Sequence, residues 1–173
     1  MKYATIKYDD IANCPGLAVS VYTQGCPHHC PGCFNESTWD FNGGIEFTEK
    51  NMNNILQGLR KNNIYHSLCI LGGEPLCEEN LEITNYIIQN VLTNIPETKI
   101  YIWSGYLLEN LIKRNDELTN SILSNIDYLI DGPFIQEQRD VTLHMRGSRN
   151  QRVIDVKETL KQNRIILSSE VIK

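Results

Sequence analysis

Three of the six cysteines in this chain of 173 residues lie in one short stretch, GCPHHCPGC, at Cys26, Cys30 and Cys33. Thiolates are good ligands for zinc and for iron–sulfur clusters. The glycines and prolines around these cysteines disfavour a helix, so we expect a tight loop. The stretch therefore predicts a metal-binding loop with three protein ligands, one fewer than a tetrahedral metal usually takes.

Three kinds of site are compatible with this spacing. A structural zinc would need a fourth ligand, from within the loop or from another part of the chain. The candidates for it are His28, His29, Cys14, Cys69 and Cys77. A redox-active dithiol would use the C-x-x-C pair Cys30 and Cys33, which leaves Cys26 without a role. A 4Fe-4S cluster held by three cysteines has one iron without a protein ligand. That is a weakness for electron transfer, but it is an open position for a substrate or cofactor in catalysis.

Charge and composition narrow the class of protein. The chain carries 16 Lys and Arg against 21 Asp and Glu, a net charge of −5. An acidic chain is a poor candidate for sequence-independent binding of nucleic acid, which depends on cationic surface. No apolar run is long enough to cross a membrane, and the first ten residues lack the apolar core of a signal peptide. We expect a cytoplasmic protein with one domain over residues 1–173, whose cysteines bind metal rather than form disulfides.

The elements that must position the cysteines alternate along the chain. Apolar runs predict strands, and apolar residues at helical spacing predict helices between them. We expect strands at residues 16–22, 68–71, 99–105 and 128–131, a fifth near residue 153, and helices within 47–63, 79–95 and 106–125. This alternation predicts an α/β domain with a mainly parallel sheet.

Special stretches follow three of these strands. The cysteine loop follows the first strand, GGEP at Gly72 to Pro75 follows the second, and Ser104-Gly105 follows the third. In open parallel sheets, ligands bind outside the carboxyl ends of the strands. We therefore expect these three stretches to meet at one edge of the sheet. The competing interpretation of GGEP alone is a plain turn that leads from a strand into a helix.

Taken together, these motifs resemble a known family. Cys-x3-Cys-x2-Cys, followed by a strand that ends in Gly-Gly-Glu-Pro, is similar to the radical S-adenosylmethionine superfamily. More narrowly, GCPHHCPGCFNESTWDF, LGGEPL, YLIDGPF and RGSRNQRVID resemble the activating proteins of anaerobic (class III) ribonucleoside-triphosphate reductases. The resemblance extends from about Asp10 to Asp155 and implies a partial (β/α) barrel of the radical SAM type. Gly32 stands where the superfamily often has an aromatic residue, and Cys14 where the narrower family commonly has glycine.

The resemblance also implies a reaction. Cys26, Cys30 and Cys33 would hold a 4Fe-4S cluster, and the amino and carboxylate groups of S-adenosylmethionine would bind its open iron. Reductive cleavage would then yield a 5′-deoxyadenosyl radical, which removes a hydrogen atom from a glycine of the large reductase subunit. The electron would come from a low-potential donor such as flavodoxin. The protein would contribute binding, orientation and exclusion of water.

Further residues follow from the same resemblance. The cofactor would be bound by a set of residues that flank the cluster and the strand ends. These are Gly32, Cys33, Phe34, Gly72, Gly73, Glu74 and Ser104. Glycines without Cβ atoms allow a ligand to approach the backbone, and Glu74 can accept hydrogen bonds from the cofactor's ammonium. Phe34 is expected to be the apolar neighbour of the cluster.

Several residues remain with two interpretations each. Asn35 and Trp39 either pack over the cluster loop or contact the partner, and a buried tryptophan in the core is the alternative. Asp131 either binds polar ligand atoms or forms a turn with the glycine after it. The family resemblance places Arg146, Arg149 and Arg152 near the active face, with contacts that the sequence does not assign. Cys69 is expected in the core, Cys14 and Cys77 have no assigned role, and His66 and His144 are expected to be structural or at the surface.

Two alternatives to the leading hypothesis remain. One is an activating enzyme for another glycyl-radical enzyme, such as a formate-lyase. Against it, this short chain lacks the ferredoxin-like insert, with two further cysteine runs, that some of those activating enzymes carry. The other is a zinc-stabilised binding module without catalytic activity.

Overall fold

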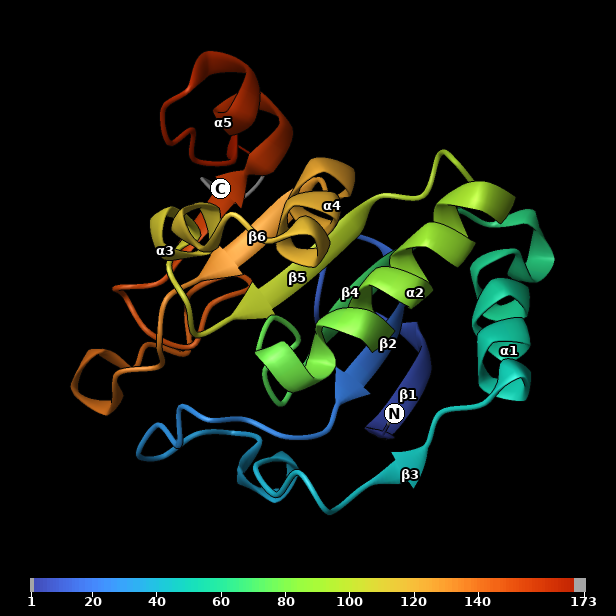
Figure 1. Cartoon of the computed structure of the whole chain (residues 1–173), viewed down its shortest axis with the longest axis horizontal. Coiled ribbons are helices and arrows are strands. Elements are labelled where there is room, and N and C mark those ends of the chain that lie inside the picture. Colours follow the sequence, from blue (N-terminus) through green and yellow to red (C-terminus); the bar gives the residue numbers. More distant parts are fainter. Residues whose placement is uncertain (1, 170–173) are drawn as a thin grey trace.

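The computed structural model describes residues 2–169, which form a mixed α/β fold around one sheet (Figure 1). The seven strands of this sheet follow the spatial order β3-β1-β2-β4-β5-β6-β7. Their bounds are β1 (Lys2–Asp10), β2 (Leu17–Thr23), β3 (Ile45–Glu46), β4 (His66–Gly72), β5 (Ile100–Ser104), β6 (Tyr128–Asp131) and β7 (Arg152–Asp155). The mixed α/β class is thus confirmed.

The middle of the sheet is parallel and its edges are antiparallel. Strands β2, β4, β5 and β6 pair in parallel, as the alternation of strands and helices predicts. Strands β1, β3 and β7 pair antiparallel with their neighbours. A parallel connection needs a crossover, usually a helix. Residues 132–151 form no crossover α-helix between β6 and β7. Strand β7 therefore begins at the edge of the sheet where β6 ends and runs antiparallel to it.

Five α-helices are found in the described part of the chain. They are α1 (Glu49–Leu59), α2 (Glu78–Asn94), α3 (Leu108–Arg114), α4 (Glu117–Asn125) and α5 (Val156–Gln162). The predicted helices are confirmed, and the segment 106–125 divides into α3 and α4. Asn115 breaks this segment by adopting a left-handed conformation with φ of 50°. Asp116 then caps α4 by accepting a hydrogen bond from the Thr119 backbone N–H at 2.8 Å.

The two faces of the sheet are packed differently. The larger core cluster joins the helices to one face and includes Leu68 and Ile70 of β4. Cys69 and Leu71 of the same strand point to the other face, where a smaller cluster contains strand residues and Cys14. Strand β4 is therefore buried on both faces, as its continuous apolar run predicts.

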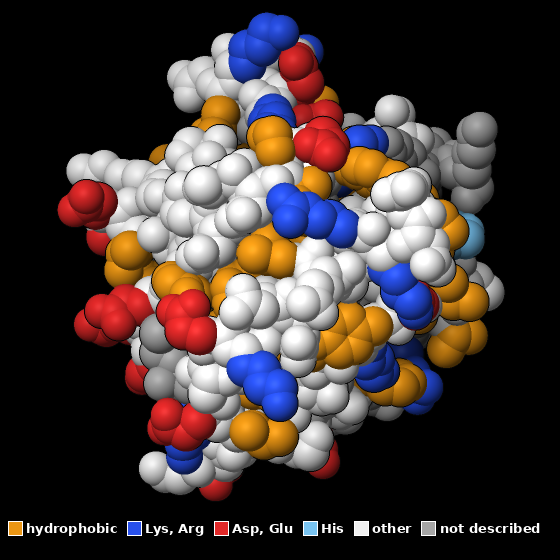
Figure 2. Space-filling view, turned by 90° about the vertical axis from the view of Figure 1, so that its right-hand side faces the viewer, with side chains coloured by type: hydrophobic (Ala, Val, Ile, Leu, Met, Phe, Trp, Pro, Cys, Tyr) orange, Lys and Arg blue, Asp and Glu red, His pale blue; other side chains and the backbone are white. Residues whose placement is uncertain are grey.

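The exterior on the α1 side shows hydrophobic side chains in small separate groups between polar and charged ones (Figure 2). No helix within residues 2–169 is long and apolar enough to span a bilayer.

Candidate functional site

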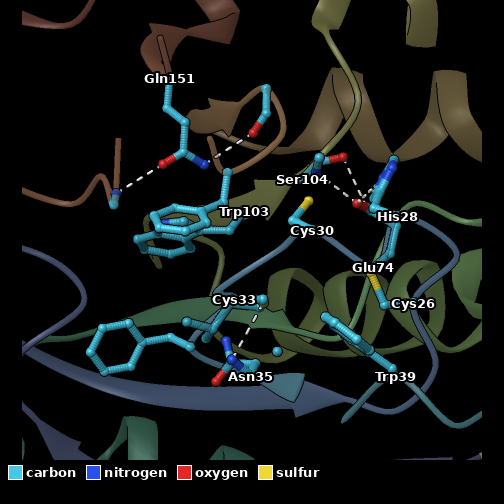
Figure 3. Close-up of a pocket in the computed structure, with 18 residues that line it drawn as sticks. Cys26, His28, Cys30, Cys33, Asn35, Trp39, Glu74, Trp103, Ser104 and Gln151 are labelled. Carbon is cyan, nitrogen blue, oxygen red and sulfur yellow. Dashed lines mark hydrogen bonds and ion pairs between the residues drawn. The ribbon is translucent and has the colours of Figure 1, made fainter. Parts of the chain in front are cut away.

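A cavity of about 180 Å³ lies at the carboxyl edge of the parallel strands (Figure 3). Its walls come from four segments that are far apart in sequence: the cysteine loop, the end of β4, the end of β5 and the loop before β7. Most of the residues predicted to form the site line this cavity. They are Cys26, Cys30, Cys33, Phe34, Gly72, Gly73, Glu74 and Ser104. Gly32 lies outside the lining and faces the side chain of Gln136.

The cysteine loop is fixed at its base by backbone hydrogen bonds. Gly25 N–H donates to the Thr38 carbonyl at 2.7 Å, and Cys26 N–H donates to the Trp39 carbonyl at 3.1 Å. Cys33 N–H donates to the Cys30 carbonyl at 3.1 Å and closes a turn between these two candidate ligands. The loop therefore leaves β2 and returns beside its own starting point, with the three thiols between.

The three thiols line the cavity at separate positions and do not converge on one point. Within residues 2–169, no three side chains of ligand type are grouped closely enough to hold a single metal ion. An iron–sulfur cluster takes its cysteines at separate corners, so three thiols around one cavity suit it better than they suit a mononuclear site. Burial raises the pKa of the Cys26 thiol to about 11, and burial also raises the pKa of Cys30. Ligation must therefore release protons from these thiols.

Both carboxylate oxygens of Glu74 are occupied by protein donors. Oε1 accepts hydrogen bonds from Leu76 N–H at 2.9 Å and from Ser104 Oγ at 2.8 Å. Oε2 accepts from Gly105 N–H at 2.7 Å and lies 2.9 Å from His28 Nε2. The side chain is 1% exposed. Glu74 thus joins the ends of β4 and β5 to the cysteine loop, a structural role that sequence reasoning missed.

The two glycines of GGEP pack against protein backbone. Gly73 N–H donates to the Thr23 carbonyl at 2.9 Å, and Glu74 N–H donates to the Gly25 carbonyl at 2.8 Å. A Cβ atom on Gly73 would lie 2.3 Å from the Gly25 carbonyl oxygen. Gly72 has a φ of +105°, which a residue with a side chain rarely adopts. Both glycines line the cavity. Gly73 permits close approach of the cysteine loop, and Gly72 permits close approach of Tyr22 in β2.

Asn80 reinforces the same junction, although no motif drew attention to it. This residue is buried in the first turn of α2. Its amide nitrogen lies 3.0 Å from the carbonyl oxygens of Gln24 and Glu74, and 3.3 Å from that of Gly25. The available signal was an asparagine on the mainly apolar face of α2, one turn before Thr84.

Aromatic side chains form much of the remaining lining. Trp103 Nε1 donates to the Met145 carbonyl at 2.8 Å, which ties β5 to the loop before β7. The Trp39 ring stacks on His29, with centroids 4.7 Å apart. Asn35 N–H donates to Cys33 Sγ at 3.4 Å. Phe34 is 86% exposed and lies below the guanidinium of Arg139, 5.8 Å from the ring centroid.

The loop between β6 and β7 supplies one wall, so the segment around Arg146, Arg149 and Arg152 lies near the candidate site, as the resemblance implied. Gly132, Phe134, Gly147 and Gln151 line the cavity. The Gln151 side chain closes this loop on itself, since its Oε1 accepts from Gly147 N–H at 2.8 Å and its Nε2 donates to the Gly132 carbonyl at 3.0 Å (Figure 3).

The three arginines that the sequence left without contacts bind acidic side chains or backbone. Arg152 pairs with Asp131 and Glu109, and Arg149 pairs with Asp140 at 3.1 Å. One guanidinium nitrogen of Arg146 lies 3.4 Å from the Gln151 carbonyl oxygen.

Asp131 is fully buried and also accepts from Leu108 N–H at 2.8 Å. It lies outside the cavity lining, so its geometry fits a structural role better than ligand binding.

The other cysteines, and the histidines His66 and His144, lie outside the cavity lining. Cys69 and Cys14 are buried together, and their contact raises the pKa of Cys69 well above the usual range. Cys77 precedes α2 and donates from Sγ to the Glu74 carbonyl at 3.1 Å. His66 is buried against the Ile64 carbonyl, 2.8 Å away, and His144 is exposed. Both histidines fit the predicted structural or surface roles.

Comparison with known proteins agrees with this site. Residues 12–154 match the family model described as a 4Fe-4S single cluster domain, which defines the class of protein. Similar proteins occur in Vibrio cholerae (38% identity, 82% of this chain, 90% of the relative), Pasteurella multocida (38%, 87% and 95%) and Escherichia coli (34%, 83% and 92%). Each is named anaerobic ribonucleoside-triphosphate reductase-activating protein. The chain belongs to this family of reductase-activating proteins.

Proposed function

We propose that this protein activates an anaerobic ribonucleoside-triphosphate reductase by generating a radical on a glycine of the large reductase subunit. One observation carries the proposal: the three loop cysteines share a single cavity with the GGEP turn and the Ser104-Gly105 turn. The names of the relatives support the choice of partner.

Cys26, Cys30 and Cys33 are the proposed ligands of a 4Fe-4S cluster, and the match to the single cluster domain supports this assignment. With S-adenosylmethionine and an electron from a low-potential donor such as flavodoxin, this cluster would supply the 5′-deoxyadenosyl radical that takes a hydrogen atom from the partner's glycine. Because three thiols leave one iron position for an external ligand, the donor set suits catalysis.

The remaining lining residues bind the cofactor and exclude water. Gly72, Gly73, Glu74 and Ser104 form the wall at the ends of β4 and β5, where the Glu74 carboxylate attracts the cofactor's ammonium. Cys33 and Phe34 form the opposite wall, at the end of the cysteine loop, and Gly32 beside them gives the backbone its turn outside the lining. The rings of Trp39, Trp103 and Phe134 make the lining largely apolar. Such surroundings protect a reactive radical from solvent.

The proposal extends to the whole chain as one domain of the radical SAM type, with its sheet curved as a partial (β/α) barrel. A sheet that is parallel in the middle, with a cavity at its carboxyl edge, supports this type. The partner would present its glycine on a flexible loop at the mouth of the cavity. Phe34 lies there and is largely exposed, so it is available to contact that loop.

Anaerobic reconstitution tests the proposal. Iron and sulfide should give a brown protein with about four irons per chain. With S-adenosylmethionine and a strong reductant it should release 5′-deoxyadenosine. With the cognate reductase it should also give a glycyl-radical signal in electron paramagnetic resonance. An intact cluster that produces no glycyl radical on this reductase would refute the proposal, as would a colourless zinc protein.

A further inference from the structure

The imidazole of His28 occupies a closely fitted position outside its own loop. His28 lies between the candidate ligands Cys26 and Cys30, yet its contacts are with residues after β4 and β5 (Figure 3). Its Nε2 lies 2.9 Å from Glu74 Oε2, and its ring centroid lies 4.4 Å from that of Tyr106 at an interplanar angle of 66°. A carboxylate oxygen accepts hydrogen bonds, so the imidazole donates its Nε2–H.

Gly105 makes room for this ring. A Cβ atom at Gly105 would lie 2.4 Å from His28 Cδ2 and 2.6 Å from Nε2. Real Cβ atoms do not approach other atoms so closely, so a side chain at this position would push the imidazole away from Glu74. The glycine that follows Ser104 is therefore explained by the histidine opposite it.

The residues that receive His28 are themselves held in place. Glu74 is fixed by hydrogen bonds from Ser104, Gly105 and Leu76. The Arg114 guanidinium lies 4.1 Å from the Tyr106 ring centroid, and it donates to the Leu76 carbonyl at 2.5 Å. Because Glu74 and Tyr106 are held in place, a side chain that binds them is held too. The contact of His28 with these residues therefore restrains the cysteine loop.

We infer that His28 is a positioning residue, which ties the middle of the cysteine loop to Glu74 and so sets the candidate ligands relative to the strand-end turns. The inference rests on the proposed function, since those turns are where S-adenosylmethionine would bind. The base of the loop is already fixed through Gly25 and Cys26. Without His28, the cluster could still assemble, but its open iron would be displaced from the binding wall.

His29 is a matched control within the same loop. It has the same side chain and the neighbouring position, but its ring stacks on Trp39 and not on Glu74 or Tyr106. The test compares His28→Ala, His28→Gln and His29→Ala with the unmodified protein after anaerobic reconstitution. Three quantities are measured: iron per chain, the KM and kcat for 5′-deoxyadenosine formation, and the change in the reduced cluster's paramagnetic resonance spectrum when S-adenosylmethionine is added.

We expect His28→Ala to retain iron, raise the KM for S-adenosylmethionine about tenfold or more, and weaken the spectral change caused by the cofactor. His28→Gln should recover much of both properties, because its amide N–H can reach the same oxygen. His29→Ala should raise the KM far less than His28→Ala, since its ring contacts Trp39 and not the wall formed by Glu74. The inference is overturned if His28→Ala retains the unmodified KM and spectrum, or if His29→Ala is impaired as much as His28→Ala.

Two further outcomes are decisive. If His28→Ala loses its iron, His28→Gln carries the test: recovery of iron and of KM supports the inference, and an equal defect overturns it. Absence of 5′-deoxyadenosine from the unmodified protein would count against the proposed function itself, so the two failures are distinguishable.

Discussion

Arg152 binds the fully buried carboxylate of Asp131 across the antiparallel pair β6–β7, with its Nε 2.9 Å from Oδ1. The two residues are partners in the strand register. The same guanidinium also donates to both oxygens of Glu109 in α3, at 2.9 and 2.7 Å. One arginine thus holds the last parallel strand, the returning strand and a helix together, directly beneath the loop that forms one wall of the cavity.

Replacement of Arg152 by alanine should destabilise the protein, because Asp131 would stay buried without its charged partner. Removing one partner of a fully buried ion pair lowers the stability of a protein by about 3–5 kcal/mol. The Arg152 side chain is 27% exposed, so we expect about 2–3 kcal/mol. Unfolding in urea measures this loss. Arg149→Ala is the control, since its pair with Asp140 is at the surface and should contribute much less to stability. Equal losses in the two variants would contradict this assignment.

The pH dependence of stability should reflect Glu109. Hydrogen bonds from Arg152 lower the pKa of Glu109 to about 2, from its ordinary value of 4.5. Because the folded-state pKa is the lower one, its stabilisation is present above pH 4.5 and is lost as the pH falls from there toward 2.

Glu109→Gln should therefore lose less stability than the unmodified protein between about pH 6 and about pH 3, by no more than about 1 kcal/mol for a side chain that is 46% exposed. Unfolding curves at the two pH values measure this difference. If the variant and the unmodified protein lose the same stability, the ion pair does not determine this pH dependence.

The cysteine assignment predicts a clear division among single variants. C26A, C30A and C33A should each lose the cluster, since each would remove one of three thiolate ligands. C69A and C77A should retain it, because these thiols lie in the core and before α2. Iron analysis and visible absorption after anaerobic reconstitution measure the outcome. A catalytically competent cluster in any of the first three variants would disprove the ligand set.

Glu74 should affect the cofactor more than the cluster. Glu74→Gln removes the negative charge that attracts the proposed ammonium, although protein donors already occupy both carboxylate oxygens. The loss is therefore one of charge attraction, about 1–3 kcal/mol at a buried carboxylate. We expect affinity for S-adenosylmethionine to fall accordingly, with iron content retained. Glutamine is preferable to alanine here, because alanine would leave all the donors around the carboxylate without an acceptor.

Titration calorimetry on the reconstituted protein measures the affinity of Glu74→Gln, and Glu79→Gln in the exposed first turn of α2 is the control. Unchanged affinity in Glu74→Gln would mean that GGEP serves only as a turn.

The sequence predicted the parts of the fold that have a local signal. The apolar run around Cys69 predicts a doubly covered strand, and the thiol spacing predicts the loop. Strand β1 lacked such a signal, since much of its surface is exposed and its polar residues interrupt the apolar pattern. The direction of β7 depends on the connection before it, which carries no periodicity.

The hydrogen bonds between the site residues were harder to predict than the residues themselves. Glu74 was recognised, but its four donors come from three segments that meet only after folding. His28 and Asn80 were missed as contacts for the same reason, because a donor and its acceptor are paired by tertiary structure. Gln151 belonged to a recognised motif, but the sequence does not show that its side chain binds both Gly132 and Gly147 and so closes the loop.

The order of the cavity walls along the chain has a consequence for maturation in the cell. Synthesis proceeds from the N-terminus, so the three thiols leave the ribosome long before the segment that carries Phe134, Gly147 and Gln151. Until that segment folds back, the thiols face solvent and are open to oxidants and to competing metals. Loading on the ribosome would therefore meet an unshielded site, whereas loading after release would meet a sheltered one. A cluster assembled after release would therefore be shielded by the wall that Phe134, Gly147 and Gln151 form.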